Sequence, residues 1–168
     1  MSADWNNAKA KAQAIRKKYA LTSPLVNLSE IASNEGIEIV YFMPNEKTDQ
    51  ISGLFDKQQR KIFLNAEEPA ARQSFTLAHE LGHYFLDHKS NEYGVYRRDS
   101  LYAESKPEKE QEADCFAAEL LMPAELIAKV KAKYGLTDDN TSALAHLFGV
   151  SPSAMRYRLK SLGHGRDD

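Results

Sequence analysis

Hydrophobic positions at the start of the chain recur with the spacing of helices that pack by one face. Between residues 4 and 20 one apolar stripe predicts an amphipathic helix; it consists of Trp5, Ala8, Ala12, Ile15 and Tyr19. Ser23-Pro24 interrupts this pattern, and a shorter helix is expected over residues 25–34, with Gly36 at its carboxyl end. The chain is therefore expected to begin with two helices.

The pattern then changes to one that is typical of β-strands. Residues 37–42 are rich in β-branched and aromatic side chains, and residues 51–56 and 61–65 flank a polar turn. We expect the last two segments to form a hairpin and all three strands to form one small sheet. A sheet of this size needs a covering layer, which we expect from the helix that follows Pro69.

Helical patterns return in the second half of the chain. They cover residues 108–122, residues 124–134, and two helices within residues 141–162 that are joined at Gly149-Val150-Ser151. The last pair has the spacing of a helix-turn-helix. Residues 90–106 follow neither pattern and are expected to be irregular. The fold class predicted from these segments is α+β.

Composition narrows the class of protein. The 168 residues are 42% hydrophobic and carry a net charge of −2, so no overall charge favours nucleic acid or an anionic membrane. Cys115 is the only cysteine, which excludes an intramolecular disulfide and fits a reducing compartment. Its apolar neighbours predict a buried, inert thiol. Because the first residues are polar and no apolar stretch approaches about 20 residues, we expect a cytoplasmic protein without membrane contact.

The strongest chemical signal is the pattern H-E-x-x-H formed by His79, Glu80 and His83. Residues four apart lie on one face of a helix, so the two histidines can bind one ion, and zinc suits imidazole nitrogens. Glu80 lies roughly 100° of helix further round from His79, where it misses the metal but reaches a water held there. A carboxylate in that position is a candidate general base.

The alternative is a surface helix with two satisfied histidines. The neighbours argue against it, because they make this helix strongly apolar: Phe75, Leu77, Ala78, Leu81, Phe85 and Leu86. Gly82 costs such a helix about 1 kcal/mol relative to alanine. It is therefore expected where another backbone approaches closely. A metal site is the better interpretation.

A third ligand is expected from the helix at residues 108–122. Glu110 and Asp114 share a face with small and apolar residues, and a buried carboxylate needs a partner or a metal. We expect Glu110 to bind the metal and Asp114 to orient a histidine through its free ring nitrogen. Glu112, two positions on, stays an alternative third ligand. The competing interpretation is a solvated acidic first turn, favoured by the helix dipole.

His88 and three tyrosines are weaker candidates. The longer metzincin pattern requires glycine at 86 and histidine at 89, where this chain has Leu86 and Lys89, so His88 is expected to support a ligand or line the cleft. A tyrosine of the irregular segment could donate a hydrogen bond to a developing oxyanion, or could simply pack at the surface; the candidates are Tyr93, Tyr96 and Tyr102.

The last helix is basic, through Arg156, Arg158 and Lys160. A single short basic helix in a chain of net negative charge is weak evidence for DNA binding. We therefore expect it to pack within the protein or dock a partner rather than contact DNA.

Taken together, these stretches resemble the ImmA/IrrE family of bacterial and phage metallopeptidases. The similarity runs from Gly53 to Leu162 and is densest over residues 62–65, 75–84, 110–123 and 148–159. The resemblance implies a zincin-like core, with the family's metal and catalytic positions falling on His79, Glu80, His83 and Glu110. It also implies a zincin-like metallopeptidase domain over residues 1–135 and a helix-turn-helix-like extension over residues 136–168.

The resemblance also implies a function. The best-understood family members cleave, or trigger the loss of, a helix-turn-helix repressor that controls mobile-element or stress genes. We therefore expect a zinc endopeptidase, with manganese as the alternative metal and such a repressor as its substrate. The competing hypothesis is a DNA-binding or partner-binding regulator, for example one half of a toxin–antitoxin pair, with a structural or sensory metal. The sequence makes no prediction of oligomeric state.

Overall fold

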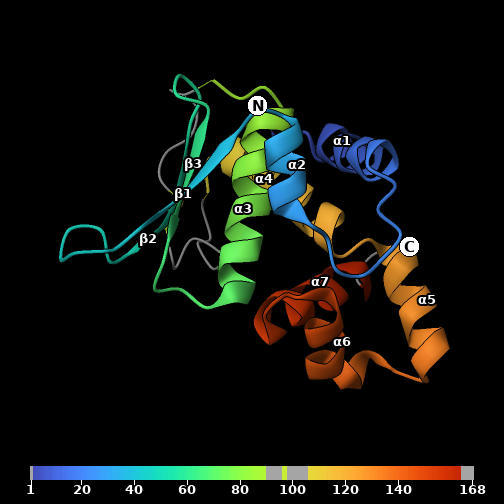
Figure 1. Cartoon of the computed structure of the whole chain (residues 1–168). Coiled ribbons are helices and arrows are strands. Elements are labelled where there is room, and N and C mark those ends of the chain that lie inside the picture. The colour runs from blue at the N-terminus through green and yellow to red at the C-terminus, as the bar shows by residue number, and fades with distance from the viewer. Residues whose placement is uncertain (1, 90–95, 98–105, 164–168) are drawn as a thin grey trace.

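A small mixed sheet lies on one side of the molecule and helices pack against it on the other, as the computed structural model shows (Figure 1). The structure describes residues 2–89, 96–97 and 106–163. The helices are α1 (Trp5–Lys18), α2 (Leu28–Asn34), α3 (Ala70–Phe85), α4 (Glu108–Leu121), α5 (Ala124–Tyr134), the 3-10 turn η2 (Asp138–Asn140), α6 (Thr141–Phe148) and α7 (Pro152–Gly163). The strands are β1 (Glu38–Phe42), β2 (Ile51–Asp56), β3 (Lys61–Asn65) and β4 (Tyr96–Arg97). The expected α+β class is confirmed.

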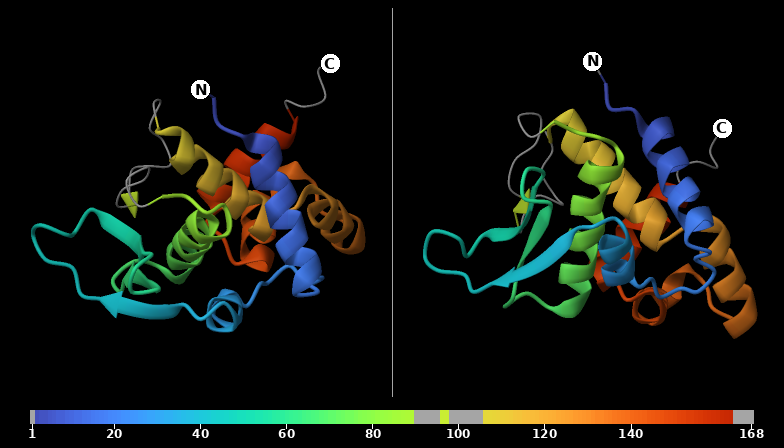
Figure 2. Two further views of the ribbon diagram at one scale, coloured as in Figure 1. Left: turned by 90° about the horizontal axis from the view of Figure 1, so that it is seen from above. Right: turned by 45° about the horizontal axis from the view of Figure 1, so that its top comes forward.

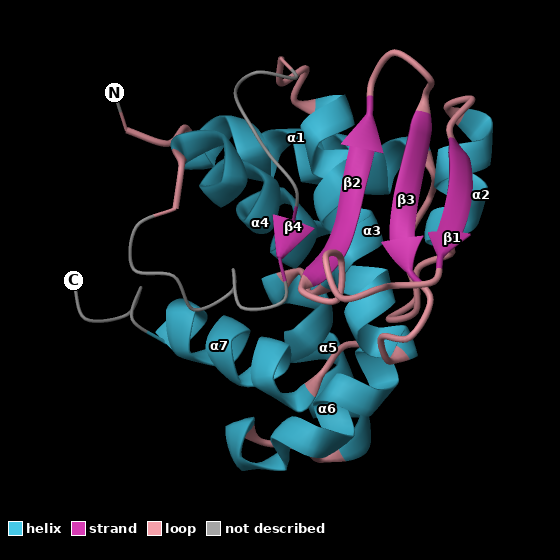
Figure 3. Cartoon of the chain, turned by 90° about the vertical axis from the view of Figure 1, so that its left-hand side faces the viewer, coloured by secondary structure: helices cyan, strands magenta, loops and turns pink. Residues whose placement is uncertain are grey.

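The sheet has the strand order β1-β3-β2-β4 (Figure 3). β2 and β3 form the expected antiparallel hairpin, in which Gly53 is opposite Leu64, and β1 pairs with β3 in parallel. β4 pairs with β2 and belongs to the segment that we expected to be irregular. That expectation was wrong at these two residues, because strand pairing with β2 imposes an extended backbone that the local sequence does not signal.

Helix α3 lies between the sheet and α4, and it carries the H-E-x-x-H pattern. It begins directly after Pro69, as expected. A Cβ on Gly53 of β2 would come within 2.5 Å of the Thr76 side chain on α3, so only a glycine permits this close contact between strand and helix. The buried residues of this layer include Phe55, Ile62, Leu64, Leu77, Ala78 and Leu81. The sheet thus fixes one side of the helix that carries the chemistry.

Helices α1 and α3 flank α4 (Figure 2). The first helix is capped by Asp4, whose side chain accepts a hydrogen bond from the main-chain nitrogen of Asn7 at 2.9 Å. On its buried face lie Ala8, Ala12 and Ile15, three members of the predicted stripe, whereas Trp5 is 46% exposed. α4 is therefore enclosed on two sides. Its first turn lies next to α3, where Glu110 contacts His79.

The two C-terminal helices pack on the rest of the protein through Arg158. This side chain is only 7% exposed. Its Nε donates to the main-chain oxygen of Met122 at 2.9 Å, and its Nη2 lies 2.6 Å from Glu119 Oε2. Arg158 therefore joins α7 to α4, which is the packing role that we expected from the basic helix. None of the helices in the described ranges combines the length and apolar composition needed to cross a bilayer.

Candidate metal centre

The packing of α3 on α4 brings together the side chains of His79, His83 and Glu110. His79 Nε2 lies 3.1 Å from His83 Nε2 and 3.1 Å from Glu110 Oε2. His83 Nε2 lies 3.2 Å from Glu110 Oε1. All three residues are buried, and together they form a group that could hold a metal ion. Glu112, the alternative third ligand, does not belong to this group of atoms.

These distances fit a tetrahedral ion. Ligand atoms at 2.0–2.1 Å from zinc lie about 3.3 Å from one another at the corners of a tetrahedron. Glu110 Oε1 is buried, and its 3.2 Å contact with His83 Nε2 lacks the geometry of a good hydrogen bond. A buried carboxylate oxygen without a well-aligned donor is costly, and a cation between the three side chains would remove that cost. The donor set of two imidazoles and one carboxylate is typical of zinc.

Protonation of the cluster follows from burial and from the neighbouring charges. Burial lowers the pKa of His79, but hydrogen bonds to Asp114 and Glu110 outweigh this effect and raise the pKa to about 10. Burial lowers the pKa of His83 to about 4. Burial also raises the pKa of Glu110, but its bonds to the two histidines hold that pKa well below its usual range. The cluster therefore contains a carboxylate anion and a neutral His83.

Asp114 orients His79 from the opposite side of the ring. Its Oδ1 lies 2.8 Å from His79 Nδ1, and its other oxygen accepts a hydrogen bond from Lys106. Once a metal displaces the proton on Nε2, the proton that stays on Nδ1 leaves the lone pair of Nε2 directed toward His83 and Glu110, as a metal ligand requires. Lys106 was not among the residues singled out from the sequence. Its position directly before Pro107, eight residues ahead of Asp114, was the available signal.

Glu80 is fully buried beside this cluster. No described side chain donates a hydrogen bond to either carboxylate oxygen, and a main-chain hydrogen-bonding contact with Phe55 on β2 acts to lower the pKa of Glu80. Burial is the dominant effect and raises the pKa of Glu80 to about 8, while the charge of His79 opposes it and that of Glu110 adds to it. A buried carboxyl group with a raised pKa next to a candidate metal site is suited to take up a proton.

His88 and Glu112 form a second pair behind His83. His88 Nδ1 lies 2.8 Å from His83 Nδ1, and His88 Nε2 lies 2.9 Å from Glu112 Oε2. Lys109 lies 3.0 Å from the same carboxylate oxygen. His88 is thus placed against a candidate ligand. Its pairing with Glu112 was not predicted, because the two residues come from different elements.

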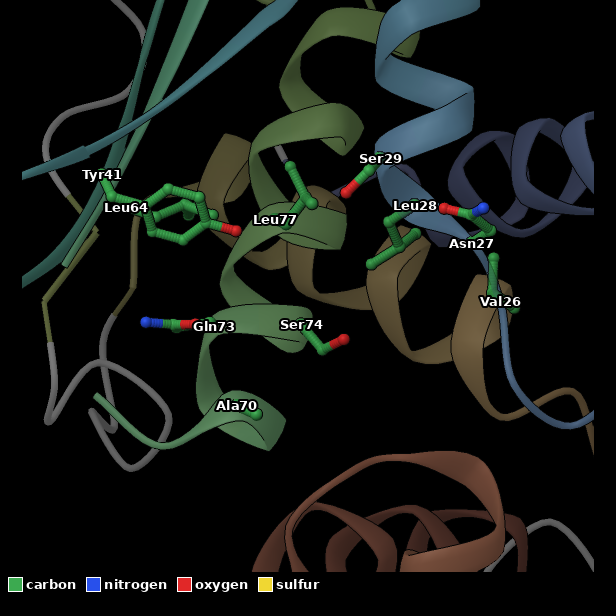
Figure 4. Close-up of a pocket in the computed structure, with 10 residues that line it drawn as sticks. All are labelled: Val26, Asn27, Leu28, Ser29, Tyr41, Leu64, Ala70, Gln73, Ser74 and Leu77. Carbon is green, nitrogen blue, oxygen red and sulfur yellow. The ribbon is translucent and has the colours of Figure 1, made fainter. Parts of the chain in front are cut away.

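A cavity and a smaller recess lie next to the helices α3 and α4. The larger cavity, about 620 Å³, lies between α1, α4 and α7 and is bordered by Asp114, Lys106 and Tyr157, so it adjoins the candidate centre. Cys115 also lines it; the thiol that we predicted to be buried is only half-buried, and this partial burial raises its pKa. The smaller recess, about 180 Å³, is bordered by α2, β1, β3 and α3 and contains none of the cluster residues (Figure 4).

The tyrosine candidates remain predictions. Tyr93 and Tyr102 lie outside the described residues, and Tyr96 is described only as part of the β4 backbone.

Comparison with known proteins identifies the family. The sequence model of the IrrE N-terminal-like domain matches residues 32–160, which is most of the chain. The radiation response metalloprotease IrrE of Deinococcus deserti is 32% identical over 159 residues, which cover 90% of this chain and 53% of that protein. This chain belongs to the ImmA/IrrE family. It spans about half the length of the IrrE relative.

Two further relatives are closer to this chain in length. Metallopeptidase ImmA of Bacillus subtilis is 27% identical over 157 residues, with 92% of this chain and 85% of that protein covered. The uncharacterized immunity region protein 2 of Bacillus phage phi105 is 31% identical over 151 residues, covering 85% of this chain and 89% of its own length. The motif residues of α3 and α4 lie within the matched range, whereas α1 precedes it.

A solved structure shares the fold. A Mycobacterium tuberculosis transcriptional regulator superposes with a TM-score of 0.64 at 15% identity, covering 95% of this chain and 48% of that one. At this identity the likeness concerns the fold alone. Members of the ImmA/IrrE family include named metallopeptidases, and this chain carries a cluster that could hold their metal.

Proposed function

We propose that this protein is a zinc-dependent endopeptidase. His79, His83 and Glu110 hold the metal, and Glu80 is the general base. The observation that carries this proposal is the convergence of the three side chains within 3.1–3.2 Å of one another, beside the buried carboxyl group of Glu80, to which no described side chain donates a hydrogen bond. The named metalloproteases among the relatives support it. Manganese is the alternative metal, because availability in the cell also decides which ion is bound.

The roles of the residues follow from their positions. When bound, zinc would polarise the scissile carbonyl and make the proton of a water molecule easier to remove. Glu80 takes that proton and delivers it to the leaving amine nitrogen. A divalent cation would lower the pKa of Glu80 because it stabilises the carboxylate anion. Asp114 holds the ring of His79 in the tautomer that leaves Nε2 free for the metal.

The proposed substrate is a helix-turn-helix repressor, cut at one accessible segment. Its cleavage would relieve repression of mobile-element or stress genes. The family resemblance and the naming of the phage relative as an immunity region protein support this class of substrate. We propose that the reaction takes place in the cytoplasm.

The test combines metal analysis with cleavage. Wild type, Glu80→Gln, His83→Ala and Glu110→Ala are compared by elemental analysis, with Glu108→Gln as the control for an acid on the same helix. We expect about one zinc per chain in wild type, Glu80→Gln and Glu108→Gln, and loss of zinc in the other two variants. Zinc retained in Glu110→Ala would contradict this ligand assignment.

The substrate is sought with the inactive variant. Glu80→Gln should retain the target without cutting it, because the metal site is intact but the base is absent; wild type should release two fragments. Removal of a general base typically costs about 10²–10⁴ in rate. Cleavage by Glu80→Gln at the wild-type rate would contradict the mechanism, and capture that never recovers a helix-turn-helix protein would contradict the substrate class.

We propose that residues 136–168 are a helical extension of the peptidase domain at residues 1–135. The competing hypothesis is a DNA-binding regulator that uses the three basic residues of α7. Arg158 is not accessible to DNA, because it is buried against Glu119. A gel shift that is abolished by replacing the two exposed cations, Arg156 and Lys160, would support DNA binding instead. We expect those replacements to leave metal binding and cleavage unchanged.

A further inference from the structure

The end of helix α3 places a histidine directly behind a candidate ligand. The main-chain nitrogen of Asp87 donates to Tyr84 O at 3.1 Å, and that of His88 donates to His83 O at 3.0 Å. These two bonds define a Schellman motif, in which the residue after the helix adopts a left-handed conformation. Asp87 has that conformation, with φ at +54°. The chain therefore reverses at Asp87 and returns the ring of His88 to the ring of His83.

The contact continues to a carboxylate on α4. His83 Nδ1 lies 2.8 Å from His88 Nδ1, and His88 Nε2 lies 2.9 Å from Glu112 Oε2. Glu112 is itself held by Lys109 and by the main-chain nitrogen of Asp4, which donates to its Oε1 at 3.0 Å. His83, His88 and Glu112 are 1%, 2% and 4% exposed. Hydrogen bonds buried to this extent are strong and fix the orientation of their partners.

The positions of the protons in this chain of contacts follow from one condition. If Nε2 of His83 offers its lone pair to a metal, its proton is on Nδ1 and is donated to His88. Nδ1 of His88 must then accept, so the proton of His88 is on Nε2 and is donated to Glu112. The other tautomer of His88 would direct two N–H groups at each other. Glu112 thus selects the tautomer of His88, and His88 selects that of His83.

We propose that His88 and Glu112 are positioning residues for the metal ligand His83, in a relay that ends on the N-terminal segment through the main chain of Asp4. The inference rests on the proposed metal site. It gives both histidine ligands the same support: Asp114 acts directly on His79, and Glu112 acts on His83 through His88. It also gives a function to the third histidine of the segment, which the peptidase mechanism does not use.

The test is a tautomer measurement on the zinc-loaded wild-type protein. With ¹⁵N-labelled histidine, long-range proton–nitrogen NMR spectra distinguish the protonated from the unprotonated nitrogen of each ring. We expect a proton on Nδ1 of His83 and a proton on Nε2 of His88. A proton on Nδ1 of His88 would overturn the proposal without any substitution, so this outcome does not depend on whether a variant folds.

Zinc affinity provides the second measurement, by competition with a chelator. His88→Phe removes the acceptor for His83 and should weaken zinc binding by about 10–100-fold, the range found for partners of metal-bound histidines. His88→Gln retains an oxygen acceptor and should recover part of that loss. Glu112→Gln should shift the tautomer of His88, whereas Glu108→Gln, one turn earlier on α4, should leave affinity and tautomer unchanged.

The outcomes separate this inference from the proposed function. Failure of the wild-type protein to bind zinc would contradict the metal site itself and overturn the relay with it. Tight zinc binding that stays within twofold of wild type in His88→Phe would overturn the relay alone. Normal zinc binding with the expected tautomers in a protein that cleaves no target would support the relay and count against the peptidase.

Discussion

Gly82 of α3 lies directly against the main chain of Ala113 of α4. A Cβ at position 82 would come within 3.2 Å of both the Cα and the carbonyl oxygen of Ala113, and within 3.1 Å of the Phe116 ring. The sequence predicted a close backbone approach at this glycine, and the structure confirms it. Because the candidate ligands lie on these two helices, the distance between α3 and α4 sets the geometry of the site.

Replacing Gly82 by alanine should therefore act on the metal site. The added methyl group requires α3 and α4 to separate by a few tenths of an ångström, which displaces Glu110 from the two histidines. Overpacking costs about 1–3 kcal/mol, and the helix propensity of alanine offsets about 1 kcal/mol of it. We expect a small loss in the free energy of unfolding and a larger loss in zinc affinity, measured by urea unfolding and chelator competition.

Gly163→Ala is the control for this substitution, since a Cβ at position 163 would meet no atom of the described residues within 4 Å. Its zinc affinity should equal that of wild type. If Gly82→Ala also has the zinc affinity of wild type, the metal site tolerates a larger separation of α3 and α4.

Asp114→Asn should weaken zinc binding about tenfold. Asparagine keeps the size and one acceptor oxygen, but it loses the negative charge that stabilises the His79 ring and pairs with Lys106. The same substitution should lower the pKa of His79 in the metal-free protein, because Asp114 raises that pKa. Histidine NMR titration measures the pKa, and the exposed Asp138→Asn is the control. An unchanged pKa would contradict the pairing.

Zinc binding should release protons at pH 7. His79, with a pKa of about 10, carries a proton that the metal must displace, and Glu80, with a pKa of about 8, loses its proton near a divalent cation. Apparent zinc affinity should therefore increase with pH, by about tenfold per pH unit for each proton released. Calorimetry in two buffers of different ionisation enthalpy counts these protons. A count of zero would show that His79 is already neutral.

The metal-free protein should lose stability as the pH rises. The folded-state pKa of His79 is raised above its ordinary value of 6.5, so its contribution to stability is present below pH 6.5 and is lost as the pH rises through about 10. Glu80 acts in the same direction between its ordinary 4.5 and about 8. Urea unfolding at pH 6 and pH 9 checks this. Glu80→Gln should reduce the difference, whereas a more stable protein at pH 9 would contradict it.

Arg158→Ala should destabilise the protein by about 3–5 kcal/mol, because it leaves the buried carboxylate of Glu119 without its partner. Arg156→Ala, at an exposed position of the same helix, should change the free energy of unfolding by less than about 0.5 kcal/mol. Urea unfolding distinguishes the two. Equal stability of both variants would show that the ion pair does not hold α7 in place.

Much of the fold was predictable because its signals are local. The hairpin strands at residues 51–56 and 61–65 have the expected bounds, and the starts of α3 and α4 follow Pro69 and Pro107. The parallel pairing of β1 with β3 and the two-residue strand β4 were not predictable, since both depend on contacts between distant segments.

The residues of the candidate site also differ in whether the local sequence predicts them. His79, Glu80 and His83 form a pattern within one helix, which a periodicity argument can detect. Glu112, the alternative third ligand, instead pairs with His88, which reaches it only because the chain reverses at Asp87. A left-handed aspartate where glycine is usual gives little warning of that reversal. The tertiary packing therefore decides how the outer residues are connected.

The ligands of the proposed zinc lie on both sides of a long stretch of chain, residues 84–109. An ion held by His79, His83 and Glu110 would join the ends of this stretch in the folded protein, much as a disulfide would in a chain that has none. The entropic cost of closing such a loop is otherwise offset by contacts such as the packing of α3 on α4. Removing the metal with a chelator should therefore destabilise the folded protein, as breaking a cross-link would. The metal would do the work of a disulfide in a secreted protein, but it would stay exchangeable.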